Sequence, residues 1–352
     1  RIGELEQQFG FVKNSAADLA TVPKGLAGIT KAHSAVNATP WAFISLALAM
    51  MMGTASLPHV MMRYFTTPSV KAARKSVGWS LFFIFLLYSS APMLATLSKL
   101  SLIDPTLSTG IIGKSFAEVQ SIDWFQNWNQ ANLMFISDFN GNGTLELNEF
   151  FMGGKAVVLA TPEIAGLPYV ISGLVAAGGM AAAMSTADGL ILAIANAISH
   201  DVYYKIIDPK AETAKRLVVA RVLLVVIGFA GATIAAMEIQ GILGSVIWAF
   251  DFAMSGLFFP LVLGVWWKRA NRQGAIAGMA LGLASSIWYL VWVRTGGSGF
   301  LGITQLTFGI FGAAVSFVAM VVVSLMTQEP DKATQKMVDE VRIPSGRTVT
   351  GK

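Results

Sequence analysis

Two hydroxyls and a carboxylate lie within four residues near the middle of a long apolar segment, Gly166–Ser199; they are Ser185, Thr186 and Asp188. An ionisable side chain at membrane depth costs at least ~2.5–3.5 kcal/mol on insertion scales, and it usually marks a path for a substrate or an ion. Glycine and alanine dominate the preceding turns, and such small residues let a neighbouring helix approach closely. If the segment lies in a bilayer, this pattern predicts part of a transport path.

The composition places the chain in a membrane. Hydrophobic residues make up 54% and charged residues 13%, with a mean hydropathy of +0.61, whereas soluble domains carry about 25% charged residues. A helix needs about 20 predominantly apolar residues to cross a bilayer. About seven runs meet this condition: Trp41–Met62, Val77–Ser98, Gly166–Ser199, Leu217–Met237, Ile239–Trp267, Gln273–Val293 and Leu301–Met326. We therefore expect an all-α membrane protein with about seven transmembrane helices.

Charge and residue usage argue against other classes. The net charge of +5 comes from short loops between the spans, which indicates contact with the lipid surface and no nucleic-acid partner. The chain has no cysteine and therefore no disulfide. Its three histidines show no metal or triad spacing and no nucleotide-binding loop is visible, so we do not expect an enzyme.

The distribution of basic residues predicts orientation and domains. Every second loop is basic, and for an odd number of spans the positive-inside rule puts the amino end outside and the carboxyl tail in the cytoplasm. We expect an extracytoplasmic loop segment over 1–40 and a transmembrane domain over 41–326 with an external loop over 99–165. A cytoplasmic tail follows over 327–352. The membrane would be a bacterial-type plasma (inner) membrane. Because Arg1 is not an initiator Met, we expect the chain to begin within a longer protein.

The external loop contains the sequence DFNGNGTLELNE over Asp138–Glu149. An EF-hand calcium loop needs oxygen ligands at positions 1, 3, 5, 7, 9 and 12 and a glycine at position 6. The glycine is Gly143, and the ligands would be Asp138, Asn140, Asn142, the Thr144 carbonyl, Glu146 and Glu149. The pattern predicts a weak structural Ca²⁺ site, with a dissociation constant of ~10⁻⁴–10⁻³ M as in extracellular modules. The alternative is a polar turn that happens to be rich in Asn and Gly.

Two tracts resemble the sodium:solute symporter family, which includes proline, sugar and acetate carriers. They are GTASLPHVMMRYFTTPSVKAARKS over residues 53–76 and MSTADGLILAIANAISHDVY over residues 184–203. The first matches a family stretch at the end of the sixth core helix through Gly53, Pro58, His59, Arg63 and Tyr64. SHDVYY and LPHVMMRYF are most similar to the acetate-permease branch. The resemblance covers about Trp41–Met326 and implies the second inverted repeat of a leucine-transporter-type fold plus two trailing helices, with the first repeat outside this sequence.

The resemblance also implies a sodium site. Ser185 and Thr186 match a hydroxyl pair that binds Na⁺ on the eighth core helix of the family, and Ala182 would add its backbone carbonyl. The chemistry agrees, because hard cations favour oxygen ligands and groups at i, i+3 and i+4 share one helical face. These atoms form half of a site, and in the family the other half comes from the first core helix. The alternative is that the two hydroxyls bond to the preceding turn and serve helix packing.

The family usually has a small or hydroxylic residue where this chain has Asp188. This carboxyl is either kept neutral by burial or carries a proton during transport. His59 and Arg63 are either interfacial anchors or parts of a gate.

Asp251, with Trp248 and Phe252, is a candidate for the lining of a substrate cavity, because buried carboxylates usually face the interior of a helix bundle.

These observations predict a secondary transporter that couples Na⁺ entry to the uptake of a small solute, a monocarboxylate such as acetate, by alternating access. One alternative is a proton-coupled carrier that uses Asp188. The other is a non-transporting membrane sensor or scaffold, although the short tail after Met326 shows no signalling or catalytic domain.

Overall fold

The computed structural model of the protein describes residues 40–342, apart from 105, 148, 154–155 and 238–241. The predicted loop segment 1–40 therefore lies outside the described residues, except for Pro40. Six described helices are long and apolar enough to cross a membrane, and a bent helix pair brings the number to seven if it counts as one span. The predicted all-α membrane class is confirmed. The described residues fall into two compact units, one formed by 77–185 and the other by 40–76 with 186–342.

The first span is broken, although the sequence predicts a continuous helix over Trp41–Met62. Helix α2 (Pro40–Ser56) ends before α3 (Pro58–Met61), which continues as the 3-10 helix η3 (Met62–Thr66). The two parts meet at an angle of 46°. The physical reason is Pro58, which lacks an N–H group and disfavours a helical conformation at the residue before it. That residue, Leu57, is extended, with φ −67° and ψ 119°.

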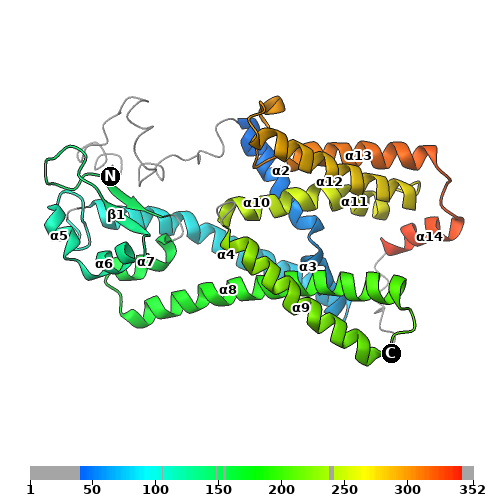
Figure 1. The fold of residues 1–352 in the computed structure, drawn as a ribbon, viewed down its shortest axis with the longest axis horizontal. Helices are drawn as coiled ribbons and strands as arrows, with labels where there is room; N and C mark the ends of the chain where they lie inside the picture. Colours follow the sequence, from blue (N-terminus) through cyan, green and yellow to red (C-terminus); the bar gives the residue numbers. More distant parts are fainter. Residues whose placement is uncertain (1–39, 105, 148, 154–155, 238–241, 343–352) are drawn as a thin grey trace. The chain divides into compact units, whose positions relative to one another are not determined.

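A helical bundle forms much of the second unit (Figure 1, yellow to orange). It contains α10 (Ile242–Ala253), the π-helical turn η5 (Met254–Phe258), α11 (Phe259–Trp266), α12 (Arg272–Arg294) and α13 (Gly309–Met326). Helices α12 and α13 pack closely because α12 presents glycine. A Cβ atom added to Gly278 would lie 3.1 Å from Met320 Cβ and 3.1 Å from the Ser316 carbonyl oxygen.

The last span is shorter than the predicted Leu301–Met326. A short 3-10 helix, η6 (Phe300–Gly302), and a turn precede α13. Leu301 has a positive φ of 52°, and the Thr304 N–H donates to Thr307 Oγ1 at 2.9 Å. These local bonds fix a turn after η6, and α13 therefore begins only at Gly309.

Helices α4 (Val70–Ile103), α8 (Tyr169–Asn196) and α9 (Thr213–Ala236) provide three further spans. Helix α4 begins seven residues before the predicted Val77 because the basic stretch is helical too. Helix α8 continues as the π-helix η4 (Ala197–Ile207).

Helix α14 (Lys332–Val341) lies in the predicted tail. Asp331 caps it by accepting a hydrogen bond from the Thr334 N–H at 3.2 Å.

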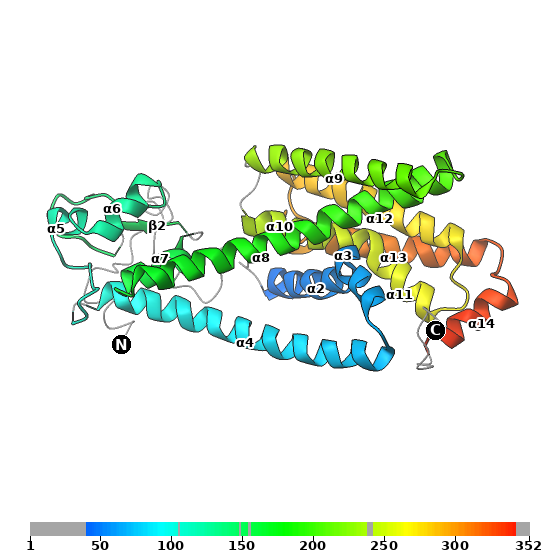
Figure 2. The ribbon, with the colours of Figure 1, turned by 90° about the horizontal axis from the view of Figure 1, so that it is seen from below.

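The segment predicted as an external loop folds into a small domain at one end of α4 (Figure 2). It contains α5 (Phe116–Gln120), α6 (Asp123–Gln130), β1 (Met134–Ile136), β2 (Phe150–Met152) and α7 (Val157–Ile164). The two strands are antiparallel. The domain has a core of its own, which includes Leu102, Ile111, Val119, Phe125, Met134, Leu145, Leu147, Phe150 and Ile164.

Candidate functional site

The predicted sodium ligands lie on one uninterrupted helix, α8 (Tyr169–Asn196). In an α-helix with 3.6 residues per turn, the carbonyl of Ala182 and the side chains of Ser185 and Thr186 lie on the same face. With the described residues alone taken into account, all three residues and Asp188 are exposed. Within that part the Ser185 hydroxyl makes no hydrogen bond. The Thr233 hydroxyl, by contrast, donates to the Phe229 carbonyl one turn earlier.

The two predicted gate residues contact α8 one residue beyond Asp188. A Cβ atom placed on Gly189 would lie 3.3 Å from Arg63 Nη2 and 3.9 Å from the Cβ and Cδ2 atoms of His59. Among the described residues, His59 Nδ1 is buried and has no hydrogen-bond partner. Gly189 is a contact point that was not predicted from the sequence. A glycine inside a helical pattern is the signal that could have indicated it, because such a glycine often has a packing reason.

The three predicted cavity residues contact the segment that leads into α13. Trp248 Nε1 donates to the Gln305 carbonyl at 2.8 Å. The Phe252 ring packs edge-on against Phe308, with 4.9 Å between the centroids. Asp251 is fully buried. The structure therefore encloses Asp251 between helices.

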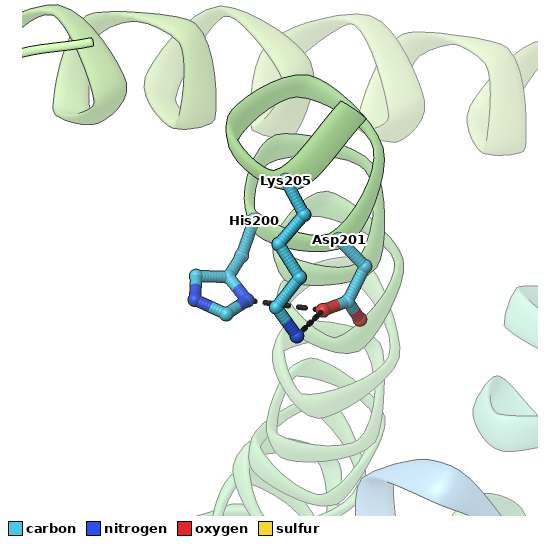
Figure 3. Close-up of polar contacts among 3 residues, drawn as sticks. All are labelled: His200, Asp201 and Lys205. Carbon is cyan, nitrogen blue, oxygen red and sulfur yellow. Dashed lines mark hydrogen bonds and ion pairs between the residues drawn. The ribbon is translucent and has the colours of Figure 1, made fainter. Parts of the chain in front are cut away.

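A polar cluster lies on η4, where the sequence places the His-Asp pair (Figure 3). His200 Nδ1 lies 3.0 Å from Asp201 Oδ1, and Lys205 Nζ lies 3.1 Å from the same oxygen. All three side chains are more than half exposed. Ion pairs between exposed side chains contribute little to stability, so the cluster is a surface feature of η4.

The connection from η4 to α9 is held by another ion pair. Lys215 Nζ donates to Asp208 Oδ2 at 2.9 Å. This hydrogen bond holds the pKa of the Asp208 carboxyl below its usual value. The Arg216 guanidinium lies 4.1 Å from the centroid of the Tyr204 ring, at cation–π distance.

The predicted calcium loop folds around its own backbone. Asp138 accepts hydrogen bonds from the N–H groups of Gly141 at 2.7 Å and Gly143 at 3.0 Å. Both glycines have positive φ, 71° and 72°, which a side chain would disfavour. The Asn140 side chain accepts from the Asn142 N–H at 2.9 Å.

The far end of the loop turns back onto its start. Glu149 is fully buried, and it accepts from the Phe139 N–H and from the Glu146 N–H, both at 3.0 Å. Asn142 Nδ2 donates to Glu146 Oε1 at 3.0 Å. Leu145 anchors the loop in the core of the small domain. Among the described residues, no group of three His, Cys, Asp or Glu side chains is arranged to hold a metal, so calcium binding stays a prediction.

The chain is similar to known membrane transporters. A model of the sodium:solute symporter family matches residues 6–102 and 155–282 and leaves out residues 103–154, which contain most of the small domain. A protein from Cupriavidus necator described as an uncharacterized symporter is 41% identical over 310 residues, which is 85% of this chain and 44% of that protein. The monocarboxylic acid transporter of Corynebacterium glutamicum is 28% identical over 257 residues, which is 72% of this chain and 39% of that protein. The chain thus spans less than half the length of these relatives.

The family model covers more than half of the chain, and it matches both of the tracts around Pro58 and Ser185. The six or seven membrane-spanning helices agree with it. The protein therefore belongs to the sodium:solute symporter family.

Proposed function

We propose that the full-length protein is a secondary active transporter in which Na⁺ entry drives the uptake of a small monocarboxylate, such as acetate, by alternating access. The observation that carries this proposal is the hydroxyl pair on α8, Ser185 and Thr186, in a chain of this family. The solute class is supported by the similarity to a protein named as a monocarboxylic acid transporter. The protein would sit in a bacterial-type inner membrane, with its carboxyl tail in the cytoplasm.

The sodium site would be built from oxygens on one turn of α8. The Ala182 carbonyl and the hydroxyls of Ser185 and Thr186 supply three oxygen donors, which suit a hard cation. The lack of a hydrogen bond from Ser185 to the preceding turn, within the described residues, argues against the helix-packing alternative for this hydroxyl. The remaining donors would come from a part of the full-length protein that precedes this chain.

His59 and Arg63 would form a gate beside this site. They contact Gly189, which is one turn beyond Ser185. A movement of the bent α2–α3 pair would therefore change the packing against α8 at this turn. The bend at Pro58 supplies a place where such a movement can occur, because helices kink where proline removes a hydrogen bond. Trp248 and Phe252 remain predicted residues of the solute cavity.

The test is the uptake of radiolabelled acetate by the full-length protein in proteoliposomes, with and without an inward Na⁺ gradient. We expect uptake in the wild type to depend on Na⁺, and Ser185→Ala and Thr186→Ala to lose most of that dependence. Ser172→Ala, on the same helix, and Thr233→Ala, on α9, are matched controls that keep it.

Three outcomes would overturn the proposal. Unchanged Na⁺ dependence in both site variants would remove the assigned site. Uptake that depends on pH but not on Na⁺ would favour a proton-coupled carrier that uses Asp188. A full-length protein that moves no solute would favour the sensor or scaffold.

A further inference from the structure

Asp251 on α10 is a carboxyl group inside the helical bundle that no charged side chain of the described residues neutralises. Its side chain has no exposed surface, and neither carboxylate oxygen has a hydrogen-bond partner among the described residues. An ionised carboxylate buried without a partner costs several kcal/mol, so in proteins such a group takes up a proton instead. The arrangement around Asp251 in this conformation therefore fits the neutral, protonated carboxyl.

The carboxyl lies at the first turn of α13. A Cβ atom added to Gly309 would stand 2.5 Å from Asp251 Oδ1, so the absence of a side chain at Gly309 is what lets the carboxyl fit. The Gly309 amide faces the carboxyl, and N–H groups in the first turn of a helix have no partner within the helix. The positive end of α13 favours a negative charge on the carboxyl, but while the helices are packed the burial of Asp251 without a charged partner opposes ionisation more strongly.

A chain of buried hydroxyls connects this position to α12. Ser255 Oγ donates to the Asp251 carbonyl oxygen at 2.6 Å and lies 3.2 Å from the Gly309 carbonyl oxygen. Ser286 Oγ donates to Ser255 Oγ at 2.7 Å. Both serines are fully buried. A buried polar network whose members are all hydrogen-bonded favours one specific arrangement of the helices it joins, which here are α10 with η5, α12 and α13.

Other ionisable groups on the elements packed around Asp251 do not offset its charge. Helices α2, α11 and α13 and the turn η5 contain no titratable residue, and α10 contains no other. Helix α12 carries Arg272, Tyr289 and Arg294. The Tyr289 hydroxyl donates to the Ile303 carbonyl at 3.1 Å, and the Arg294 guanidinium lies 5.2 Å from the centroid of the Trp248 ring. The described part of the chain contains no ion pair of Asp251.

The helix that carries Asp251 changes its geometry directly after it. The π-helical turn η5 begins at Met254 and includes Ser255. Single π-helical turns inside α-helices are frequent at functional sites, and they are places where a helix bends. A bend at η5 would part Asp251 from Gly309, break the Ser255 bonds and admit water to the carboxyl.

We propose that Asp251 is a proton-binding site of the transport cycle, protonated while α10 packs against the start of α13 and deprotonated when these helices separate. The step is the binding and release of one H⁺ by the carboxylate, with no other bond made or broken. This inference rests on the proposed transport function. It assigns Asp251 a role in binding a proton, in place of the predicted lining of the solute cavity.

The first test compares infrared spectra of the full-length wild-type protein and its variants in lipid at neutral pH, as differences between the wild type and each variant. We expect the carbonyl band of a protonated carboxylic acid in the wild type and the loss of this band in Asp251→Asn, which keeps the size and shape of the side chain. Asp123→Asn, which removes an exposed carboxylate on α6, keeps the band. Gly309→Ala retains the carboxyl but places a methyl group against Asp251 Oδ1, and we expect a shift of the band frequency. Identical bands in the wild type, Asp251→Asn and Gly309→Ala would overturn the proposal.

The second test is the pH profile of Na⁺-driven acetate uptake by the same proteins. We expect Asp251→Asn to lose the pH dependence of the wild type while its Na⁺ dependence remains. A variant profile that matches the wild type would overturn the proton site in transport. If the wild type shows no Na⁺-driven uptake, the proposed function fails, and the infrared band alone then decides whether Asp251 holds a proton.

Discussion

Arg63 Nη2 lies 3.3 Å from the position that a Cβ atom would take on Gly189. Because α8 has no side chain there, the segment after the proline break approaches α8 directly beside Asp188. His59, in the first of the two tracts that resemble the family, and Met184, at the start of the second, are 125 positions apart in the sequence. The structure places the two tracts in contact.

Filling this contact should impair transport. The valine side chain of Gly189→Val would displace Arg63 and His59, and overpacking of this kind typically costs 1–3 kcal/mol. If this cost is added to the activation barrier of the transport cycle, the uptake rate falls about tenfold for each 1.4 kcal/mol. We expect a rate about 5- to 150-fold lower for Gly189→Val and a smaller effect for Gly189→Ala, since the flexible end of Arg63 can move. Gly178→Val is the control, because an added Cβ there meets nothing within 4 Å. Equal rates for the two valine variants would refute the contact.

The close packing of α12 and α13 should govern stability. Gly278→Leu places a Cβ atom 3.1 Å from Met320 Cβ and the Ser316 carbonyl, with a larger side chain beyond it. We expect a loss of about 1–3 kcal/mol in the free energy of unfolding, seen as a lower unfolding temperature of the purified full-length protein in detergent. Gly264→Leu on α11, where an added Cβ meets nothing within 4 Å, should unfold close to the wild-type temperature. A Gly278→Leu protein as stable as this control would contradict the packing.

The attachment of α14 should depend on pH. Asp339 Oδ2 lies 2.7 Å from Lys268 Nζ, in the connection between α11 and α12, and Asp339 Oδ1 lies 2.5 Å from Arg342 Nη2. The hydrogen bond from Lys268 lowers the pKa of the Asp339 carboxyl. A carboxyl with a lowered pKa in the folded state contributes stability above its unfolded pKa, about 3.9 for Asp. That contribution is lost as the pH falls through the folded value.

Hydrogen–deuterium exchange measures this attachment. At pH 7, Asp339→Asn should exchange faster than the wild type in α14, because the neutral amide makes weaker bonds to Lys268 and Arg342. Below the folded pKa of Asp339 the two proteins should exchange alike. Glu340→Gln, which alters a pair within α14 whose atoms lie 3.6 Å apart, serves as the control. A difference that persists at acid pH would exclude titration of Asp339 as its cause.

Calcium should stabilise the small domain if the loop over Asp138–Glu149 binds it. We expect millimolar Ca²⁺ to raise the unfolding temperature of the wild type, in keeping with the ~10⁻⁴–10⁻³ M affinity of extracellular sites, and Mg²⁺ to do so less. Asp138→Asn and Glu149→Gln should lose this effect. Glu118→Gln, in the capping box of α5, should keep it. A wild-type unfolding temperature that Ca²⁺ leaves unchanged would favour the polar turn.

Much of the architecture could be predicted from the sequence, because in a bilayer the backbone must satisfy its own hydrogen bonds and long apolar runs therefore become helices. The runs around Val225, Leu281 and Val318 correspond to α9, α12 and α13. The ends of the helices were less predictable. Apolarity does not distinguish the helix at Met326 from the turn at Leu301, whose conformation depends on local bonds between Thr304 and Thr307.

The candidate site, too, could be predicted from the sequence only in part. The spacing of Ala182, Ser185 and Thr186 along a helix follows from the sequence, because neighbours on one helical turn are set by covalent connectivity and pitch. The contact of Arg63 with Gly189 and the enclosure of Asp251 by Gly309 are decided by tertiary structure. Both contacts form where a glycine on one helix lets another segment approach closely. They also depend on the proline break and the π-helical turn, which set the direction of the chain near the polar groups. Hydropathy carries no information about such distances, since it records how apolar a residue is and not what it packs against.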